Sequence, residues 1–343
     1  MKVAPRRAAL QNRRHMTTDI AGKILLTGAS GFIGGRLRDA LLTRGCDVIA
    51  IRRKGSPPSK KGRSVEAEYD DREALVRIVE SEKPDYVFHV AGATKGISYG
   101  DFHRANVVPT ENLIAAIEKA HPACKRLVLV SSLAAFGPSR RERPLSEGDI
   151  RRPIEFYGQS KLEAEHVVER SSVAWTIVRP SGVYGPGDAD YFNLFREVEG
   201  GRNVFFGNHD RLFSAIYVDD LIDAILLAAT SASAVSKGYF VDDGRIVTWG
   251  EFQRAIVDAS GRRAMTLRLP EALVTVAAIG GEMASRLDGK PRLFNRQKAK
   301  MGAQEAWTCQ SDALRKDTGW SPHVPMEEGV RRAYAWYRSE KWL

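Results

Sequence analysis

The sequence predicts an α/β fold: a doubly wound parallel sheet with a smaller C-terminal lobe that binds the substrate. Short apolar runs alternate with segments of helical periodicity from residue 23 onward, and this alternation is typical of parallel strands connected by helices. Two of the runs, residues 86–90 and 126–130, are apolar almost throughout, which is typical of strands buried on both faces of a sheet. A glycine-rich turn directly follows the first run.

The elements follow in order along the chain. The first strand is predicted over residues 23–27, and the first helix over 32–44, where apolar residues share one face and Gly45 closes the helix. Later strands are predicted over residues 47–51, 65–69, 86–90, 126–130, 175–178 and 239–241. The 65–69 run is the weakest of them.

The regular pattern fades after Pro180. Residues 183–214 are rich in Gly, Asn, Asp and Phe, and residues 260–310 are rich in basic and small residues. We interpret both segments as insertions at the carboxyl edge of the strands, where open α/β sheets bind ligands.

The composition is that of an ordinary globular protein. The 343 residues are 43% hydrophobic and 27% charged, which allows a full core. No apolar run approaches the roughly 20 residues of a membrane-spanning helix. The three cysteines lie far apart, and the seven histidines form no cluster in sequence. We therefore expect free thiols in a reducing cytoplasm, surface or core histidines, and no metal site.

The first sixteen residues form a basic arm, with five basic residues and no acid in a chain of net charge +10. The favoured interpretation is a disordered leader before a start near Met16, since the arm lacks the apolar core of a secretory signal. The alternative is peripheral attachment to the anionic inner face of a membrane, at about 1 kcal/mol per basic residue. Nucleic acid binding is less favoured, because no basic–aromatic motif accompanies the charge.

Three glycines, Gly28, Gly31 and Gly34, stand between the first predicted strand and the first predicted helix. In this position glycines permit a tight turn, close approach of the backbone to a phosphate, and packing of the helix on the sheet. The helix N-terminus then favours the anion. The turn predicts a Rossmann domain that binds a dinucleotide; the alternative is a turn that is merely flexible.

The predicted domain boundaries follow from these patterns. By residue number they are 1–20 for the arm, 21–182 for the Rossmann domain and 183–343 for the substrate-binding lobe, from which 215–245 return to the Rossmann domain.

The end of the second predicted strand indicates which nicotinamide cofactor is bound. An NAD site usually has an acid there, for the ribose 2′-hydroxyl, but this chain reads Ile51-Arg52-Arg53-Lys54. A guanidinium can hold a 2′-phosphate through two parallel hydrogen bonds. We predict NADP(H), clamped by Arg52 and Arg53; the alternative is a solvated basic loop.

Tyr157 and Lys161 form a pair suited to proton transfer. A free tyrosine titrates at about 10 and a lysine at about 10.4. With the two residues one helical turn apart, the ammonium favours the phenolate and lowers the pKa of the tyrosine toward neutral pH. An acid/base beside a hydride carrier predicts an oxidoreductase.

Together these stretches resemble the extended short-chain dehydrogenase/reductase family over most of the chain. The resemblance is found, in the family's order, in residues 27–34, 85–93, 130–137, 157–161, 179–187, 217–220, 319–322, 327–329 and 336–337. It implies a catalytic set of Asn106, Ser132, Tyr157 and Lys161, with Ser131 as the alternative serine. The implied cofactor contacts, besides the glycines and arginines above, are Ser30, Phe32, Ile33, Asp70, Asp71, Val90, Ala91, Gly92, Tyr157, Lys161, Pro180 and Val183.

The resemblance also implies a role for each catalytic residue. Tyr157 gives a proton to the carbonyl oxygen as hydride reaches the carbon, or removes it in the reverse reaction. Lys161 lowers the pKa of the tyrosine and bonds the nicotinamide ribose, and Ser132 stabilises charge on the reacting oxygen. Asn106 either takes part in catalysis with these three residues or only holds a helix or a water molecule in place.

Two positions bear on the substrate. Nucleotide-sugar members of the family usually carry a diphosphate-binding asparagine where this chain has Ser181 and Gly182, and an arginine where it has Phe213, although Arg211 lies nearby. The second lobe also holds aromatic residues that either form ordinary core or face an apolar substrate. These are Tyr191, Phe192, Phe195, Phe205, Phe206 and Phe213.

The sixth-strand stretch and a small-residue helix expected over 273–287 resemble the branch of 3β-hydroxysteroid dehydrogenases, flavonol reductases and bacterial ceramide-pathway reductases. This implies a lipid-like ketone, first a 3-oxo-sphingoid or 3-oxo-ceramide and second a 3-hydroxysteroid. The alternatives are a nucleotide-sugar epimerase or dehydratase and a non-catalytic dinucleotide-binding scaffold. The intact Ser132, Tyr157 and Lys161 disfavour the scaffold. The family suggests a homodimer.

Overall fold

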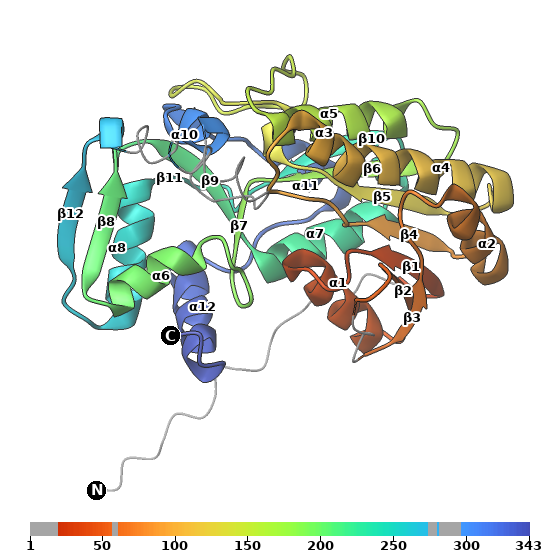
Figure 1. Ribbon diagram of the computed structural model, residues 1–343, viewed down its shortest axis with the longest axis horizontal. Coiled ribbons are helices and arrows are strands. Elements are labelled where there is room, and N and C mark those ends of the chain that lie inside the picture. Colours follow the sequence, from red (N-terminus) through yellow and green to blue (C-terminus); the bar gives the residue numbers. More distant parts are fainter. Residues whose placement is uncertain (1–19, 57–60, 274–279, 281–295) are drawn as a thin grey trace, which may run out of the picture.

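Seven parallel strands form the central sheet of a computed structural model that describes residues 20–56, 61–273, 280 and 296–343 (Figure 1). The strands are β1 (Lys23–Thr27), β2 (Asp47–Arg52), β3 (Arg63–Glu66), β4 (Tyr86–His89), β5 (Arg126–Val130), β6 (Trp175–Pro180) and β10 (Lys237–Val241). Their order is β3-β2-β1-β4-β5-β6-β10. It reverses direction between β1 and β4, which is where such sheets bind ligands.

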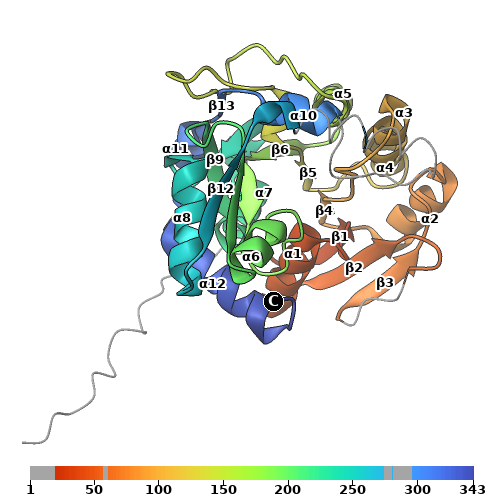
Figure 2. The same ribbon diagram turned by 60° about the vertical axis from the view of Figure 1, so that its left-hand side comes forward.

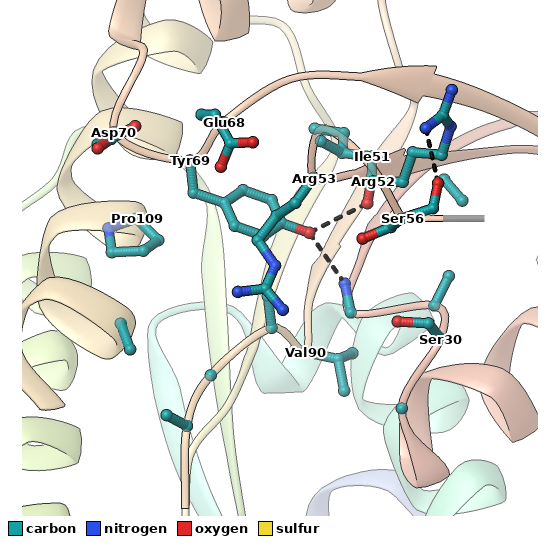
Figure 3. Close-up of a pocket in the computed structure, with 18 of the residues that line it drawn as sticks. Ser30, Ile51, Arg52, Arg53, Ser56, Glu68, Tyr69, Asp70, Val90 and Pro109 are labelled. Carbon is teal, nitrogen blue, oxygen red and sulfur yellow. Dashed lines mark hydrogen bonds between the residues drawn. The ribbon is translucent and has the colours of Figure 1, made fainter. Parts of the chain in front are cut away.

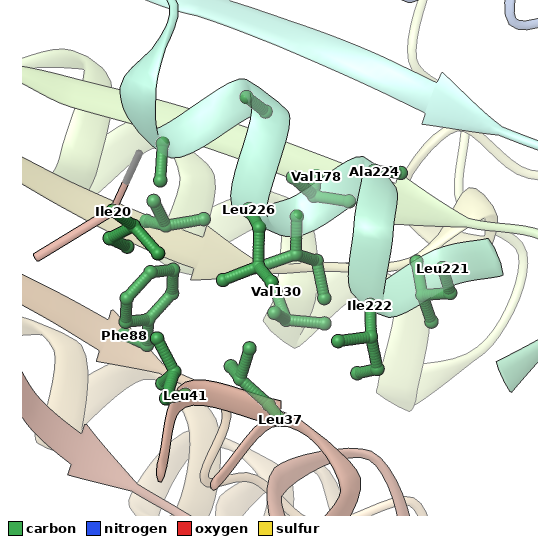
Figure 4. Packing of buried hydrophobic residues seen from close by; sticks show 14 of the residues in the cluster. Ile20, Leu37, Leu41, Phe88, Val130, Val178, Leu221, Ile222, Ala224 and Leu226 are labelled. Atoms are coloured by element: carbon green, nitrogen blue, oxygen red, sulfur yellow. The ribbon is translucent and has the colours of Figure 1, made fainter. Parts of the chain in front are cut away.

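Helices cover both faces of this sheet. One face carries α1 (Phe32–Thr43), α7 (Val218–Thr230) and α11 (Asp312–Thr318), and the other carries α2 (Arg72–Glu82), α4 (Val108–Ala120) and α5 (Phe156–Glu169). In β1, Ile24 packs toward the first layer and Leu25 toward the second, and both are fully buried. Figure 4 shows Leu37 of α1 and Leu221 of α7 in the first of these clusters. Burial on both faces explains the uninterrupted apolar runs.

The smaller lobe is built mainly from the C-terminal half (Figure 1 and Figure 2). Its elements are β7 (Gly182–Tyr184), α6 (Phe192–Glu199), β8 (Arg202–Phe206), β9 (Leu212–Tyr217), β11 (Ile246–Thr248), α8 (Trp249–Ser260), β12 (Met265–Leu269), α10 (Arg296–Gly302), β13 (Ala306–Trp307) and α12 (Met326–Ser339). The strand β9 pairs with β7, β11 and β13, and β8 pairs with β12.

The α/β fold with a parallel sheet is confirmed, and every predicted strand is present. The third strand lies at Arg63–Glu66 rather than at 65–69. The segment 183–214, interpreted as an insertion at the carboxyl edge of the strands, contains β7, α6, β8 and β9, none of which the sequence pattern predicted. These short strands pair with partners distant in sequence, such as β8 with β12. The hydrophobic pattern of the nearby sequence therefore does not predict them.

The aromatic residues of the smaller lobe belong mostly to its core. Phe195, Phe205 and Phe213 are buried, and Tyr191 and Phe192 pack partly buried against the same lobe's core cluster. The side chain of Phe206 lies outside the described part of the chain.

Two sequence predictions fall on segments that the structure does not describe. The helix expected over 273–287 is one of them, apart from residues 273 and 280, and the basic arm is the other, apart from residue 20. In the described part of the chain, no helix has the length and apolar character needed to span a bilayer. The three cysteines, Cys46, Cys124 and Cys309, are buried and unpaired.

Candidate functional site

The turn between β1 and α1 brings backbone segments too close together for side chains. Gly28 adopts a φ of 74°, and a Cβ there would lie 2.6 Å from the amide nitrogen of Ala91. A Cβ on Gly34 would lie 2.1 Å from the Gly28 carbonyl oxygen. Gly31 is the N-cap of α1, and no described side chain caps this helix. The first amides of α1 are therefore available to an anion.

A chain of hydrogen bonds fixes the point where the strand order reverses. Thr27 Oγ1 accepts the N–H groups of Val90 and Ala91, each at 3.1 Å, and lies 2.7 Å from Nδ1 of His89. Nε2 of His89 lies 3.1 Å from the Thr110 hydroxyl of α4. Burial lowers the pKa of His89 to about 3, so the ring is neutral. His89 is thus a hydrogen-bonded core histidine that helps to hold Ala91 against the glycine turn.

A cavity of about 770 Å³ lies over this turn, at the carboxyl ends of β1, β2 and β4 (Figure 3). Its volume is typical of a cofactor site. The predicted cofactor residues that line it are Gly28, Ser30, Gly31, Arg52, Arg53, Asp70, Val90, Ala91 and Gly92. Those outside its lining are Phe32, Ile33, Gly34, Asp71, Tyr157, Lys161, Pro180 and Val183.

The two arginines at the end of β2 differ in their partners. Arg52 forms an ion pair with Glu66 of β3 at 2.6 Å and donates to the Ser56 carbonyl oxygen at 2.8 Å. The Arg53 guanidinium forms no ion pair or hydrogen bond within the described residues. Figure 3 shows its side chain extending across the Tyr69 ring, whereas Arg52 is directed toward Ser56.

Glu68 and Tyr69 line the cavity, and the sequence analysis missed both. The Tyr69 hydroxyl donates to the Ile51 carbonyl oxygen at 3.0 Å and accepts the Gly28 N–H at 3.3 Å, so it joins the end of β2 to the glycine turn. Glu68 accepts the Lys54 N–H at 2.8 Å, which fixes the backbone beside Arg53. The sequence could have indicated both residues as cavity-lining, because they end the weakly predicted strand at 65–69 and such sheets bind ligands at the carboxyl ends of their strands.

Two neighbouring acids after β3 have different roles. Asp70 lines the cavity and is exposed. Asp71 lies outside the lining, because its carboxylate accepts the Ala74 N–H at 2.9 Å and caps α2.

The first turn of α5 presents Tyr157. Glu155 caps this helix by accepting the N–H groups of Tyr157 and Gly158, each at 2.7 Å. The Tyr157 ring lies 6.3 Å from the ring of Phe102. Burial raises the pKa of Tyr157 to about 12, and a hydrogen bond from Ser132 acts in the opposite direction. The phenol is therefore protonated at neutral pH.

Lys161 lies one turn further along α5 and is buried. Its ammonium donates to the Val130 carbonyl oxygen at 2.8 Å, and burial lowers its pKa to about 8. A Cβ on Gly92 would lie 3.8 Å from Lys161 Nζ, so the ammonium reaches the margin of the cavity. The prediction that Lys161 lowers the pKa of Tyr157 toward neutral is wrong, since burial raises that pKa and the only lowering cause is Ser132. The Lys161 ammonium is instead held at the end of β5.

The structure separates the two candidate serines. Ser131 is buried and donates to Glu165 at 2.5 Å. Ser132 accepts the Ala134 N–H at 3.1 Å and lies close enough to Tyr157 to lower the pKa of its phenol. Ser132, rather than Ser131, is thus brought to the tyrosine.

A buried charge network joins α5 to the central sheet. Glu165 of α5 is fully buried and accepts hydrogen bonds from Arg179 of β6, at 3.0 Å from both Nε and Nη2. Arg151 lies 3.3 Å from the same carboxylate. Together with Ser131, this network joins α5 to the ends of β5 and β6.

Asn106 lies in a π-helical turn, His103–Val107, and is buried. Its side chain accepts the Ala93 N–H at 2.7 Å and donates to the Ala93 carbonyl oxygen at 3.1 Å and to Ser160 Oγ at 2.8 Å. These bonds tie the loop after β4 to α5, which favours the positioning role over a catalytic one.

The other predicted cofactor residues lie along the glycine turn and the end of β6. Ile33, Val90 and Val183 each pack against the larger core cluster, and Pro180 ends β6. Phe32 Cδ2 lies 3.7 Å from the position of a Cβ on Gly187.

Comparisons with known proteins agree with this geometry. The model of the NAD-dependent epimerase/dehydratase family matches residues 24–241. The chain is 29% identical to a ceramide reductase of Caulobacter vibrioides, covering 96% of this chain and 98% of that protein. It is 30% identical to a 2-alkyl-3-oxoalkanoate reductase of Stenotrophomonas maltophilia (91% and 98% covered) and 30% identical to a 3-beta-hydroxysteroid dehydrogenase of Mycolicibacterium neoaurum (77% of each).

Solved structures share the fold. A UDP-glucose 4-epimerase of Thermotoga maritima superposes with a TM-score of 0.75 at 22% identity, over 93% of this chain and 99% of that one. The UDP-glucose 4-epimerase of Thermus thermophilus, solved with NAD, gives 0.72 at 23% identity, over 92% and 99%. At these identities the likeness shows the fold alone.

Proposed function

Because the chain belongs to the NAD-dependent epimerase/dehydratase family, within the extended short-chain dehydrogenases/reductases, we propose that this oxidoreductase interconverts a ketone and a secondary alcohol on a lipid-like molecule, with NADP(H). The observations that carry the proposal are the nearness of Ser132 to Tyr157 and the position of the Lys161 ammonium at the margin of the cavity.

In the reductive direction Tyr157 acts as the acid. Its phenol carries a proton at neutral pH, so it can protonate a carbonyl oxygen without prior activation. The Ser132 hydroxyl, which lies beside the phenol, has one proton and can turn to donate it to the substrate oxygen as negative charge develops there. Lys161, anchored on Val130, holds its ammonium beside Gly92. Bound NADPH would supply the hydride.

The preference for NADP(H) rests on Arg53. The glycine turn and the uncapped α1 terminus suit a pyrophosphate, and the Arg53 guanidinium enters the same cavity without a described partner. A 2′-phosphate is the anion that such a guanidinium binds well. Arg52 supports this arrangement from its ion pair with Glu66.

The proposed substrate is a 3-oxo-sphingoid or 3-oxo-ceramide first, and a 3-hydroxysteroid second. The printed names of the relatives, a ceramide reductase, a 3-oxoalkanoate reductase and a hydroxysteroid dehydrogenase, support a lipid-like ketone or alcohol. The nucleotide-sugar alternative loses support at two positions. Phe213 is buried and stacked on Trp249 at 4.3 Å, and Arg211 donates to both carboxylate oxygens of Glu271.

The test is a panel of long-chain 3-ketones and 3-ketosteroids with the purified protein and NADPH. We expect NADPH consumption with the long-chain ketones, and Tyr157→Phe to abolish it while NADPH binding persists. Interconversion of a UDP-sugar without net cofactor change would establish an epimerase instead. NADPH binding with no turnover of any substrate, unaffected by Tyr157→Phe, would indicate a scaffold.

A further inference from the structure

Two charged side chains of α5 are held by consecutive residues at the end of β5. The Lys161 ammonium donates to the Val130 carbonyl oxygen at 2.8 Å. The Ser131 hydroxyl donates to Oε1 of Glu165 at 2.5 Å, and the Ser131 N–H donates to the Val178 carbonyl oxygen of β6 at 2.7 Å. Lys161 and Glu165 lie one helical turn apart, so their side chains leave the same side of α5. The end of β5 therefore fixes both charges relative to each other.

The Glu165 carboxylate is fully buried and has donors on both oxygens. Besides the Ser131 hydroxyl, Oε1 accepts Nε of Arg179 at 3.0 Å, and Oε2 accepts Nη2 of Arg179 at 3.0 Å. Arg179 is itself closely enclosed, because a Cβ on Gly238 of β10 would lie 2.5 Å from both Nη1 and Nη2. The Arg179 guanidinium also lies 4.9 Å from the centre of the Phe136 ring. The Glu165 carboxylate thus has a fixed place and direction.

The Lys161 ammonium lies where little solvent reaches it. The residue is 5% exposed, and burial lowers its pKa to about 8, while the charge of Glu165 acts in the opposite direction. Burial, and after it the Lys161 charge, lowers the pKa of His89 of β4 to about 3, so His89 is neutral at pH 7. Tyr157 is also neutral there. Among the described residues, Glu165 is the acid whose charge supports the ammonium.

The ammonium also faces the cofactor cavity. A Cβ on Gly92, which lines the cavity, would lie 3.8 Å from Lys161 Nζ and 2.7 Å from Oδ1 of Asn106. A hydrogen bond from a charged donor is about twice as strong as one from a neutral donor. Both the place and the charge of the Lys161 side chain therefore matter to a molecule bound in the cavity.

We propose that Glu165 is a positioning residue for Lys161: held by Ser131 and Arg179, its carboxylate keeps the Lys161 side chain positively charged and directed at the cofactor. This inference rests on the proposed function, because it takes NADPH to be the molecule that the ammonium meets. It gives the buried network a role in cofactor binding, in addition to fastening α5 to the sheet.

The test measures the NADPH dissociation constant by fluorescence titration from about pH 6 to about pH 10, on either side of the Lys161 pKa of about 8. In the wild type, NADPH affinity should fall about tenfold as pH rises through this pKa, because the neutral amine is a weaker donor. Glu165→Gln removes the anion that favours the ammonium, so the midpoint of this fall should move about one pH unit lower. Glu165→Asp retains the charge and should keep the midpoint near that of the wild type, although it also disturbs the packing.

Two further variants complete the series. Glu163→Gln makes the same change of charge on the same helix, at a side chain that is 42% exposed, and should leave the midpoint in place. Ser131→Ala removes the bond that holds Oε1 on the side of β5 and leaves the charge of Arg179 compensated, so this variant should fold. Its midpoint should move in the same direction as that of Glu165→Gln, but by less.

The outcomes separate the inference from the proposed function. A wild type whose NADPH affinity is constant over this pH range would overturn the inference, and so would an equal displacement of the midpoint in Glu165→Asp and Glu165→Gln. If Glu165→Gln does not fold, an unmoved midpoint in Ser131→Ala overturns the inference by itself. A wild type that binds NADPH with the expected pH dependence but reduces no ketone would overturn the proposed function and leave the role of Glu165 intact.

Discussion

Arg52 and Arg53 are two arginines in adjacent positions, and they differ only in the residues that each contacts. Arg52 pairs with Glu66 across β2 and β3 and so belongs to the sheet edge. Arg53 enters the cavity over Tyr69, and Glu68 fixes the backbone that follows it. The sequence placed both arginines at the cofactor but could not divide their roles, because Glu66 comes from a strand that the sequence marks only weakly.

Arg53→Ala should weaken NADPH binding by roughly ten- to a hundredfold and leave NADH binding nearly unchanged, since only NADPH carries the 2′-phosphate. Arg52→Ala is the matched control and should change the ratio of the two affinities little. The measurement is fluorescence titration of both cofactors with each variant. Loss of NADH affinity in Arg53→Ala would contradict the assignment.

His89 predicts an acid sensitivity of the fold. Its pKa is about 3 in the folded protein because of burial, and about 6.5 when unfolded. Between these values the unfolded chain binds one more proton than the folded chain at this position, so stability falls as pH falls from 6.5 toward 3. Chemical denaturation at pH 7 and pH 4.5 should show a smaller loss in His89→Gln than in the wild type. An identical loss in both would show that His89 is not the cause.

At the scale of elements, the catalytic geometry depends on how α5 is fastened to the sheet. Glu165 receives Arg179 of β6 and Ser131 at the end of β5, and Asn106 ties α5 to the loop after β4. The helix that carries Tyr157 and Lys161 is thus held in place by side chains of other elements. The sequence marked Tyr157, Lys161 and Ser132, but the burial of Glu165 and the bonds of Asn106 depend on elements far apart in the chain.

Glu165→Gln should destabilise the protein by about 3 kcal/mol, because it removes the charge that compensates the buried Arg179. Glu73→Gln, which affects only an exposed pair with Arg77 at 3.8 Å, should have no measurable effect. Urea denaturation of both variants provides the comparison. Equal stabilities would show that the network contributes little.

At the scale of the whole molecule, the strands of the larger sheet were predictable from the sequence, whereas the strands of the smaller lobe were not. Apolar runs such as 126–130 mark strands buried on both faces, whatever surrounds them. The position of β9 is instead determined by its pairing with β7, β11 and β13. Each of these partner strands is only two or three residues long. Their order is fixed by the tertiary structure, which a local pattern does not contain.

The attachment of the basic arm to a membrane stays a prediction, as does the homodimer. Removing residues 1–16 takes five of the basic residues from the chain, so it should reduce cosedimentation with anionic vesicles and leave cosedimentation with neutral vesicles unchanged. Ketone reduction in solution serves as the control and should be retained. Equal vesicle binding with and without the arm would favour the simple leader.

The ion pair between Lys95 and Asp190 joins the loop after β4 to the loop before α6, and so links the two lobes next to Tyr157. Both side chains are about half exposed, and such pairs hold weakly and are screened by salt. This pair therefore adds little to what holds the two lobes together, and salt weakens it further. If the proposed lipid-like substrate enters and leaves at this point, its exchange should become faster as ionic strength rises.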